Sequence, residues 1–317
     1  MSTFLVTGGA GFIGSHIVDE LVRQGEKVRV LDNFSTGKKE NLEDSLKKIE
    51  LIEGDIRDEN NLRNALKGTD FVLHQAALRS VVRSIDDPVA TNDVNISGTL
   101  MLLKIAVECG VKRVVYASSS SVYGDNPSLP KIETQLPAPV SPYAVSKVAG
   151  EYYCRVFSKT FGLETVSLRY FNVFGPRQDP ESRYAAVIPK FIISVFKGEP
   201  LEVHGDGKQT RDFSYVDNVV RANILAAKAG DPEKISGEVF NVACGSNYSI
   251  MDIAEAIAKV TGKKPEYKFT PSRKGDVRHT LADISKAKRH LGYDVSVDFS
   301  EGMKRTIEYF RKVSSAI

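Results

Sequence analysis

The sequence predicts an α/β fold in which a doubly wound parallel sheet is followed by a smaller α/β lobe. Two observations in the first half of the chain predict the sheet. Short runs rich in β-branched residues alternate with longer amphipathic stretches, and a glycine-rich turn follows the first of these runs. This is the order of strand–helix–strand units packed around a parallel sheet.

The expected strands cover residues 4–7, 27–31, 50–53, 71–74, 113–117 and 165–169. Helical spacing occurs at residues 13–24, 60–66, 89–109 and 142–159, and the glycines at 25, 68, 110 and 162 stand where such helices should end. After residue 170 helical patterns lie near residues 185–197, 215–229, 250–260 and 300–311. We therefore expect a Rossmann domain over residues 1–170, to which later segments return, and a second lobe over residues 171–317.

Composition excludes several classes of protein. The 317 residues include 43 Lys and Arg against 40 Asp and Glu, and a net charge of +3 gives no general attraction to nucleic acid or to an anionic membrane. The three cysteines are far apart and form no CxxC pair, so we expect no disulfide framework, no metal site and a cytoplasmic location. We expect no signal peptide, because the first residues run at once into the glycine-rich turn, and the sequence contains no run of about 18 apolar residues.

Gly8, Gly11 and Gly14 follow the first strand and precede an apolar-periodic helix. In that context a glycine-rich turn lets the backbone approach a pyrophosphate, which the start of the helix then binds. The spacing is one residue wider than the usual G-x-G-x-x-G pattern, and a turn with a structural role alone is the alternative.

Asp32 ends the second strand, 18 residues after Gly14, where an acidic side chain can accept hydrogen bonds from the adenosine ribose. Its charge would repel a 2′-phosphate, so we expect NAD rather than NADP, although Lys38 and Lys39 leave room for NADP. Asp32 alone could instead cap the turn that follows it. Asp55, at the end of the third strand, could accept from the adenine amino group.

His74 ends the fourth strand, and we interpret it as a core or turn residue because the strand is apolar. Ala76 and Ala77 follow it, and their small side chains fit the close approach of a flat cofactor.

Tyr143 and Lys147 lie four residues apart on one face of a predicted helix, which Ser141 caps and Pro142 begins. A phenol with a pKa near ~10 is a poor base at neutral pH, but an ammonium group and the start of a helix favour its phenolate. The pair could then move a proton to and from a hydroxyl group. Exposed helices often carry such a pair with no function.

Four serines at positions 118–121 follow the fifth strand, and parallel strands bring them to the same sheet edge as the glycine-rich turn. One of them could hydrogen-bond a substrate oxygen while Tyr143 moves its proton. A polar turn is the alternative interpretation.

Taken together, these motifs resemble the extended short-chain dehydrogenase/reductase family over nearly the whole chain. Within that family the chain looks most like the nucleotide-sugar 4-epimerases, through segments that read RYFNVFG from Arg169, GDG from Gly205, RDF from Arg211 and RKGD from Arg273. The resemblance implies an enzyme with bound NAD, a UDP-sugar substrate, an NAD-binding first domain and a second lobe that mainly binds the nucleotide sugar.

The resemblance also assigns residues to roles. It implies Ser119 as the catalytic serine, Tyr143 as the acid and base, and Lys147 as the residue that holds the nicotinamide ribose, with Ser120 near the site. It implies cofactor contacts from Gly8, Gly11, Phe12, Ile13, Gly14, Asp32, Asn33, Ser35, Gly37, Asp55, Ile56, Gln75, Ala76, Ala77, Asn95, Ser118, Tyr143, Lys147 and Tyr170. It implies substrate contacts from Arg79, Ser80, Ser119, Ser120, Tyr143, Asn172, Ala186, Val187, Val203, His204, Arg211, Arg273, Asp276 and Thr280. The planar forks of Arg211 and Arg273 suit phosphate oxygens.

The implied reaction is the interconversion of 4-epimers through a transient 4-keto sugar, with no net redox change. Related 4,6-dehydratases usually carry an acidic pair after the catalytic Ser or Thr, where this chain has Ser120 and Ser121. Related uronic-acid decarboxylases commonly carry Glu at the position of Ser121. Epimerisation is therefore the expected activity.

The expected substrate is UDP-N-acetylglucosamine, alongside UDP-glucose. The segment RSVVRS from Arg79 and the segment YAAVIP from Tyr184 resemble the branch that acts on N-acetylated sugars. Thr280 replaces a bulky side chain found in relatives restricted to unacetylated hexoses, which leaves volume for an acetamido group.

Two alternatives stay open. A UDP-glucuronate 4-epimerase or decarboxylase would need a cation facing the sugar carboxylate, which Arg79, Arg83 or Arg183 could supply. A non-catalytic NAD-binding protein is the other. We also expect a homodimer by resemblance, paired through the helices at 89–109 and 142–159; burial of these helices within one chain is the alternative.

Overall fold

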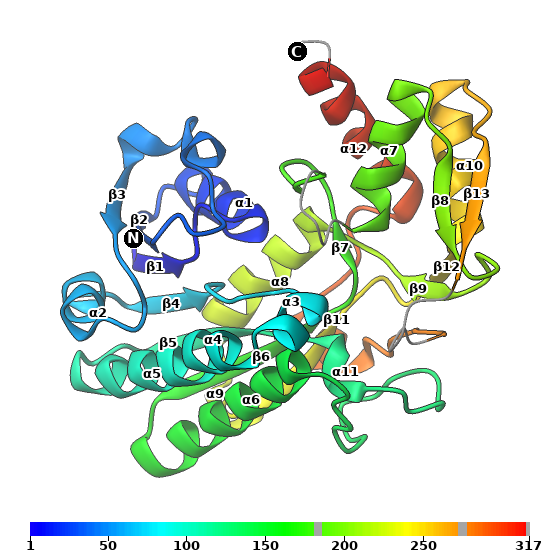
Figure 1. Ribbon diagram of the computed structural model, residues 1–317. Coiled ribbons are helices and arrows are strands. Elements are labelled where there is room, and N and C mark those ends of the chain that lie inside the picture. Colours follow the sequence, from blue (N-terminus) through cyan, green and yellow to red (C-terminus); the bar gives the residue numbers. More distant parts are fainter. Residues whose placement is uncertain (181–185, 272–277, 315–317) are drawn as a thin grey trace.

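A seven-stranded parallel sheet with the strand order β11-β6-β5-β4-β1-β2-β3 forms the centre of the protein (Figure 1). The computed structural model describes residues 1–180, 186–271 and 278–314. The strands of this sheet are β1 (Thr3–Thr7), β2 (Lys27–Asp32), β3 (Ile49–Glu53), β4 (Phe71–His74), β5 (Arg113–Ser119), β6 (Glu164–Tyr170) and β11 (Glu238–Val242). The six strands expected from the first half of the sequence are confirmed, and β11 comes from the second half.

Helices cover both faces of the sheet because side chains alternate along each strand. Val6 of β1 packs into one core with Ile17 of α1 (Phe12–Arg23) and Val219 of α8 (Val216–Lys228). Leu5, the preceding residue, packs into the other core with Leu103 of α5 (Thr99–Glu108), which α2 (Glu59–Leu66) and α6 (Pro142–Phe161) complete. The doubly wound fold predicted from the sequence is therefore confirmed.

β1 and β4 are parallel neighbours in the sheet. From β1 the next two strands, β2 and β3, are added on one side, whereas β4, β5 and β6 are added on the other, so the strand order reverses between β1 and β4. At such a switch point the connections leave in opposite directions and open a crevice at the carboxyl ends of the strands. β11 extends the same sheet beyond β6, and α8 packs on its face, so segments after residue 170 contribute to it. The division of domains at residue 170 stays a prediction.

The single helix expected over residues 89–109 is wrong in detail. The structure has α4 (Pro88–Asn92), a π-helical turn η3 (Asp93–Gly98) and then α5. Within this turn the Asn95 side chain pairs with the backbone N and O of Leu78, and Gly98 passes so close to Ile56 that a Cβ would lie 2.7 Å from its side chain. We attribute the wider turn to these two contacts, which the helical period in the sequence does not record.

The second lobe contains three helices and a pair of strands that lie apart from the large sheet (Figure 1). These are α7 (Val187–Lys197), α10 (Ile250–Thr261), α12 (Phe299–Ser314), β8 (Leu201–His204) and β13 (Tyr267–Thr270). The helical patterns expected near residues 185–197, 215–229, 250–260 and 300–311 correspond to α7, α8, α10 and α12. The pairing of β8 with β13 was not predicted.

Short elements join the two parts of the molecule. Two further strand pairs are β7 (Val173–Phe174) with β10 (Ser214–Tyr215) and β9 (Thr210–Asp212) with β12 (Asn247–Ser249). The remaining elements are α3 (Val81–Asp86), α9 (Pro232–Ile235), α11 (Ser285–Leu291) and the 3₁₀ turns η1 (Lys39–Leu42), η2 (Leu46–Lys48) and η4 (Ser120–Tyr123).

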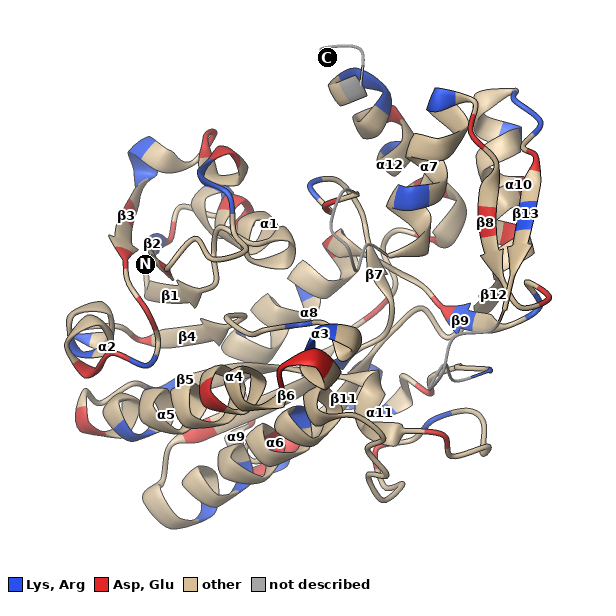
Figure 2. Cartoon of the chain, viewed as in Figure 1, with Lys and Arg blue, Asp and Glu red and all other residues tan. Residues whose placement is uncertain are grey.

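Basic and acidic residues are interspersed along the helices and strands of both parts (Figure 2). This distribution accords with the small net charge of +3. Within the described ranges, none of the helices has the length and apolar character needed to cross a membrane.

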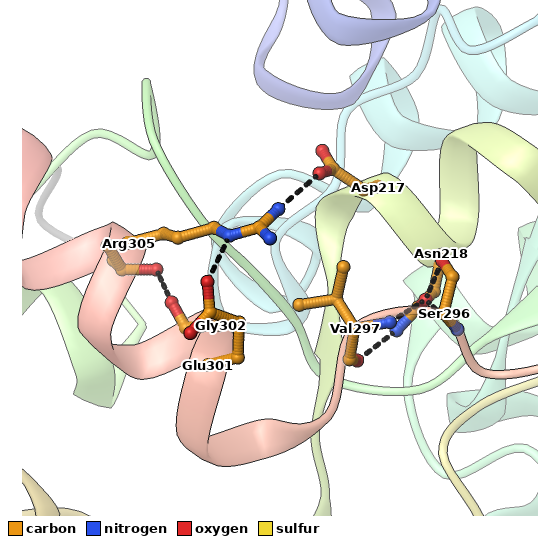
Figure 3. Close-up of polar contacts among 8 residues, drawn as sticks. Asp217, Asn218, Ser296, Val297, Glu301, Gly302 and Arg305 are labelled. Atoms are coloured by element: carbon orange, nitrogen blue, oxygen red, sulfur yellow. Dashed lines mark hydrogen bonds and ion pairs between the residues drawn. The ribbon is translucent and has the colours of Figure 1, made fainter.

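Asn218 fastens the segment before α12 to α8 (Figure 3). Its side chain is fully buried, donates to the carbonyl of Val297 at 2.7 Å and accepts from the N–H groups of Ser296 and Val297. Arg305 of α12 reaches Asp217, the preceding residue of α8, at 3.4 Å. The two contacts lie side by side but differ in burial.

We expect Asn218→Ala to lower the free energy of unfolding by about 2–3 kcal/mol, because several buried polar groups lose their partners. Arg305→Ala is the control, and its effect should stay within about 0.5 kcal/mol because the Arg305 side chain is 45% exposed. Urea denaturation of both variants measures the difference. Equal losses would contradict the assignment of Asn218 as the anchor.

Candidate active site

Three adjoining cavities of about 320, 390 and 780 Å³ run from the carboxyl edge of the large sheet into the second lobe. Arg79 lines all three. Tyr143 lines the first and second, and Asn172 lines the second and third. The three cavities therefore form one continuous cleft, which we call the first, second and third cavity in that order.

The first cavity collects nearly all of the residues expected to bind the cofactor. They are Gly8, Gly11, Phe12, Ile13, Gly14, Asp32, Asn33, Ser35, Gly37, Asp55, Ile56, Gln75, Ala76, Ala77, Ser118, Tyr143, Lys147 and Tyr170. Their side chains and backbone come from the ends of six strands, β1 to β6, and from the start of α1 and α6. The carboxyl edge of the sheet is what gathers them.

The glycine-rich turn is shaped by close backbone contacts. Gly8 has a φ of +67°, and a Cβ there would lie 2.7 Å from the backbone N of Ala76. A Cβ on Gly14 would lie 2.2 Å from the carbonyl oxygen of Gly8. Gly11 differs, because its φ of −75° suits any residue. A Cβ on Gly11 would lie 3.1 Å from the Gly8 carbonyl oxygen, and the residue borders the first cavity. The turn thus leaves open a cradle for phosphate at the start of α1.

Asp32 and Asp55 lie at the ends of β2 and β3, on the floor of the first cavity. The Asp32 carboxylate accepts from the N–H groups of Ala10 and Phe34, and burial raises its pKa. It therefore caps the turn, as one interpretation held, and it also borders the cavity. Arg57 binds Asp55 and lowers the pKa of that carboxyl to about 2.

Lys38 and Lys39, which had left NADP open, are directed to carboxylates. Lys39 lies 3.2 Å from Glu53, and Lys38 lies 3.9 Å from Asp179. A cofactor with a 2′-phosphate would meet the Asp32 carboxylate at the ribose end of the cavity. The residues present fit NAD.

The three groups expected to carry the chemistry meet at the junction of the first and second cavities. Ser141 caps α6 by accepting from the N–H of Ala144, and Pro142 begins the helix, as predicted. The Tyr143 phenol is hydrogen-bonded to the Ser119 hydroxyl, and the Nζ atom of Lys147 lies 5.8 Å from the centroid of the Tyr143 ring. Ser119, which is distant in the sequence, thus lies beside the Tyr143–Lys147 pair.

The pKa of Tyr143 differs from the expectation. We expected the ammonium and the helix start to lower the pKa of Tyr143, but burial raises it and outweighs the lowering by the Ser119 hydrogen bond and the Arg79 charge. Burial also lowers the pKa of Lys147 to about 8, which the charge of Glu151 opposes. The Lys147 ammonium donates to the Ala117 carbonyl oxygen at 2.8 Å.

His74 is a core residue, as the sequence indicated. It is 1% exposed, and its two ring nitrogens hydrogen-bond the hydroxyl groups of Thr7 and Thr99. Burial, with a smaller effect of the Lys147 charge, lowers the pKa of His74 to about 3. It is therefore neutral at physiological pH.

Residues expected to bind the substrate line the second and third cavities. Ser119, Ser120 and Thr280 line the second, while Ser80, Ala186, Val187 and His204 line the third, and Arg79, Asn172 and Arg211 line both. Asn172 has a φ of +26°, which is uncommon for a residue other than glycine, and its side chain donates to the Asp212 carbonyl at 3.1 Å. The expected contacts Arg273 and Asp276, and the cation Arg183, lie outside the described residues.

Two expected contacts do not reach the cleft. The Asn95 amide is directed to Leu78 and to the Ser146 hydroxyl, so the buried side chain ties η3 to α6 instead of lining the first cavity. Val203 is fully buried, because the alternation along β8 turns it into the core while His204 faces the third cavity.

Other lining residues were missed. Arg57 borders the first cavity, and Lys131 borders the second although this residue is 1% exposed. Arg83, expected only as a cation for a sugar carboxylate, borders the first cavity. For Arg57 a signal existed, since it lies two residues after Asp55 at the end of a strand. Lys131 had none, because only the folding of the loop between η4 and α6 brings it beside the serines.

We expect Gly11→Ala to weaken NAD binding by about tenfold or more, because its methyl group would crowd the phosphate cradle, 3.1 Å from the Gly8 carbonyl oxygen, at a backbone φ that alanine can adopt. Gly230→Ala is the control, since a Cβ at Gly230 meets no atom within 4 Å. Titration of the purified variants with NAD measures both affinities. Wild-type affinity in Gly11→Ala would contradict the location of the cradle.

Residues 4–243 match the model of the NAD dependent epimerase/dehydratase family. A crystal structure of UDP-glucose 4-epimerase from Thermotoga maritima, with UDP-glucose, is 41% identical with a TM-score of 0.93, and the match covers 98% of this chain and 99% of that one. UDP-N-acetylglucosamine 4-epimerase from Methanobrevibacter ruminantium, in complex with UDP-N-acetylmuramic acid, is 42% identical with the same coverage and TM-score.

UDP-glucuronic acid 4-epimerase from Bacillus cereus, with UDP-glucuronic acid and NAD, is 36% identical with a TM-score of 0.91, over 98% of this chain and 99% of that one. The cleft at the sheet edge, the glycine cradle beside Asp32 and the group of Ser119, Tyr143 and Lys147 agree with these likenesses. This chain belongs to the NAD-dependent epimerase/dehydratase family, as an NAD-using enzyme of its UDP-sugar 4-epimerase group.

Proposed function

We propose that this enzyme interconverts UDP-N-acetylglucosamine and UDP-N-acetylgalactosamine, and also UDP-glucose and UDP-galactose. The observation that carries the choice of sugar is Thr280, whose small side chain lines the second cavity together with Ser119 and Tyr143. A bulkier side chain there would take up the space that an acetamido group needs. The likeness to an N-acetylglucosamine epimerase supports the same choice.

The proposed chemistry uses the side chains at the junction of the cavities. NAD, held in the first cavity, supplies a reversible hydride acceptor for the sugar C4–H. Tyr143 takes the proton of the C4 hydroxyl and later returns it, while Ser119 hydrogen-bonds the same oxygen. Burial raises the pKa of Tyr143, which disfavours the phenolate. The positive charge of Lys147 stabilises the phenolate and offsets this effect when substrate and cofactor fill the site.

Epimerisation requires the nucleotide to be held while the hexose turns over. Asn172 and Arg211 line both the second and the third cavity, and we assign to them the diphosphate. The Arg211 guanidinium is oriented by the carbonyl groups of Thr210 and Arg278, at 2.9 and 3.2 Å. The third cavity, of about 780 Å³, then takes the nucleoside.

A UDP-glucuronate 4-epimerase is the second candidate, favoured by a specific feature. Arg79 lines all three cavities and could face a sugar carboxylate near Tyr143. The likeness to the Bacillus cereus enzyme is compatible with this activity. Decarboxylation is less favoured, because this chain has Ser121 where uronic-acid decarboxylases commonly carry Glu.

The experiment compares three substrates with one enzyme preparation. We expect 4-epimers from UDP-N-acetylglucosamine and from UDP-glucose, separated by chromatography, and no epimer or CO₂ from UDP-glucuronate. Tyr143→Phe should lower turnover by at least about 100-fold because it removes the acid and base, while NAD stays bound. Turnover of UDP-glucuronate alone would overturn the choice of sugar, and turnover of none would overturn the proposed activity.

We also propose a homodimer. Val145, Tyr152 and Val156 form one stripe along α6, and all three are about half exposed, with Val89 of α4 exposed nearby. A second copy would cover this apolar stripe. The cytoplasmic location stays a prediction from the cysteine pattern.

Sedimentation at micromolar concentration should give twice the mass of one chain. Tyr152→Glu should shift the protein toward the monomer, because a charge would be buried in the interface. Leu46→Glu is the control, because Leu46 is an apolar residue of η2 that is also about half exposed and lies outside both helices. A monomeric wild type would overturn the dimer.

A further inference from the structure

An ion pair between Glu151 and Arg169 is buried directly behind the reactive group. Both side chains are 3% exposed, and the two nitrogens of the arginine fork donate to the two carboxylate oxygens at 2.8 and 2.7 Å. Glu151 lies on α6 one turn after Lys147, and Arg169 lies at the end of β6. Burial of an ion pair seldom adds stability over apolar packing, so its position calls for another reason.

Glu151 has a third partner, which connects it to the active site. The Ser118 hydroxyl donates to the same carboxylate. Ser118 lies between Ala117, whose carbonyl accepts from Lys147, and Ser119, which is hydrogen-bonded to Tyr143. One carboxylate thus joins α6 to the carboxyl ends of β5 and β6 at the residues that border the reactive group.

The groups that face Lys147 come from three elements. They are Tyr143, Glu151 and Cys154 of α6, Tyr116 of β5 and His74 of β4. Burial keeps three of them neutral, because it raises the pKa of Tyr116 and of Cys154 and lowers that of His74. When Tyr143 is protonated, Glu151 is therefore the group among these five that carries a negative charge.

We propose that Glu151 is a positioning residue for the reactive group: it holds Lys147 as an ammonium beside Tyr143 and, through Ser118, keeps Ser119 in reach of the same phenol. The inference rests on the proposed acid–base role of Tyr143. It does not depend on which sugar is turned over.

A second ion pair of the same residue types, in which the glutamate is 34% exposed, offers a control. Arg113 and Glu164 are paired neighbours on β5 and β6, as Ser118 and Arg169 are, but they lie at the opposite end of the strands. The Arg113 side chain is 5% exposed and also donates to three carbonyl groups at the C-terminal end of α8, those of Ala226, Ala227 and Ala229. Arg113 therefore keeps these partners when Glu164 is changed. Glu164→Gln is therefore the same substitution in a structural pair away from the cleft.

The expected effect of Glu151→Gln has a definite sign. The neutral amide removes the charge that raises the pKa of Lys147, so burial lowers that pKa further below about 8. Lys147 then loses its proton at a lower pH, and the alkaline limb of the pH profile of kcat should move down by about one pH unit. Since Glu151 does not line the cleft, kcat should fall while KM changes little.

The experiment measures kcat and KM from pH 6 to 10 for the wild type, Glu151→Gln and Glu164→Gln, with whichever UDP-sugar the wild type turns over. A second readout needs no turnover: acetic anhydride labelling as a function of pH, with the Lys147 peptide read by mass spectrometry. We expect a lower apparent pKa of Lys147 in Glu151→Gln and the wild-type value in Glu164→Gln.

Each result decides the inference. The same limb and the same Lys147 pKa in all three proteins would overturn it, as would an equal shift in Glu164→Gln. If Glu151→Gln does not fold, Glu151→Gln/Arg169→Met removes both buried charges, and its Lys147 pKa should still lie below that of the wild type; a wild-type value overturns the inference. A wild type without turnover counts against the proposed function, and the labelling result still tests Glu151.

Discussion

The hydrogen bond from the Lys147 ammonium to the Ala117 carbonyl joins the helix that carries the acid–base pair to the strand that carries the serines. Lys147 is 4% exposed, so its ammonium group has lost most of its hydration, and a single carbonyl oxygen replaces little of it. The ring of Tyr116, at 5.0 Å, and the carboxylate of Glu151 supply the remaining stabilisation. The packing of α6 on β5 thus brings the Ala117 carbonyl and the Tyr116 ring to the Lys147 nitrogen.

Further buried polar side chains are linked to one another at the same end of the sheet. Arg169, Glu151 and Ser118 form one connected set, and the guanidinium of Arg169 also stacks over the ring of Tyr123 at 4.6 Å. Tyr123 in turn donates to Asn241 of β11 at 2.6 Å. Side chains as well as backbone hydrogen bonds therefore link neighbouring strands at the edge of the sheet that borders the cleft.

The second lobe meets this edge through another buried carboxylate. Asp212 is fully buried and accepts from the N–H groups of Cys244, Gly245 and Ala282. Its own carbonyl accepts from the side chain of Asn172. The segments that line the second and third cavities are thereby fixed to one another.

The sequence by itself determined the doubly wound sheet, the glycine-rich turn at its edge, and the Tyr143–Lys147 pair and serine run to which the chemistry is proposed to belong. Each leaves a local signature: β-branched runs of fixed length, glycines at strand–helix turns, and a Tyr and a Lys one helical turn apart. The parallel sheet then brings the strand ends together, which is why Asp32, Asp55 and the serines could be placed at one edge from their position after a strand.

Only the tertiary structure decided what depends on contacts between distant segments. The π-helical turn at Asn95 follows from the backbone of Leu78, and the position of Lys131 at the cleft follows from a loop closing over the serines. The pKa of Tyr143 is of the same kind, since burial raises it and outweighs the lowering by the Ser119 hydrogen bond and the Arg79 charge. Periodicity and spacing encode which face of an element is apolar, whereas burial and partners at that face are set by chain segments that lie far away in sequence.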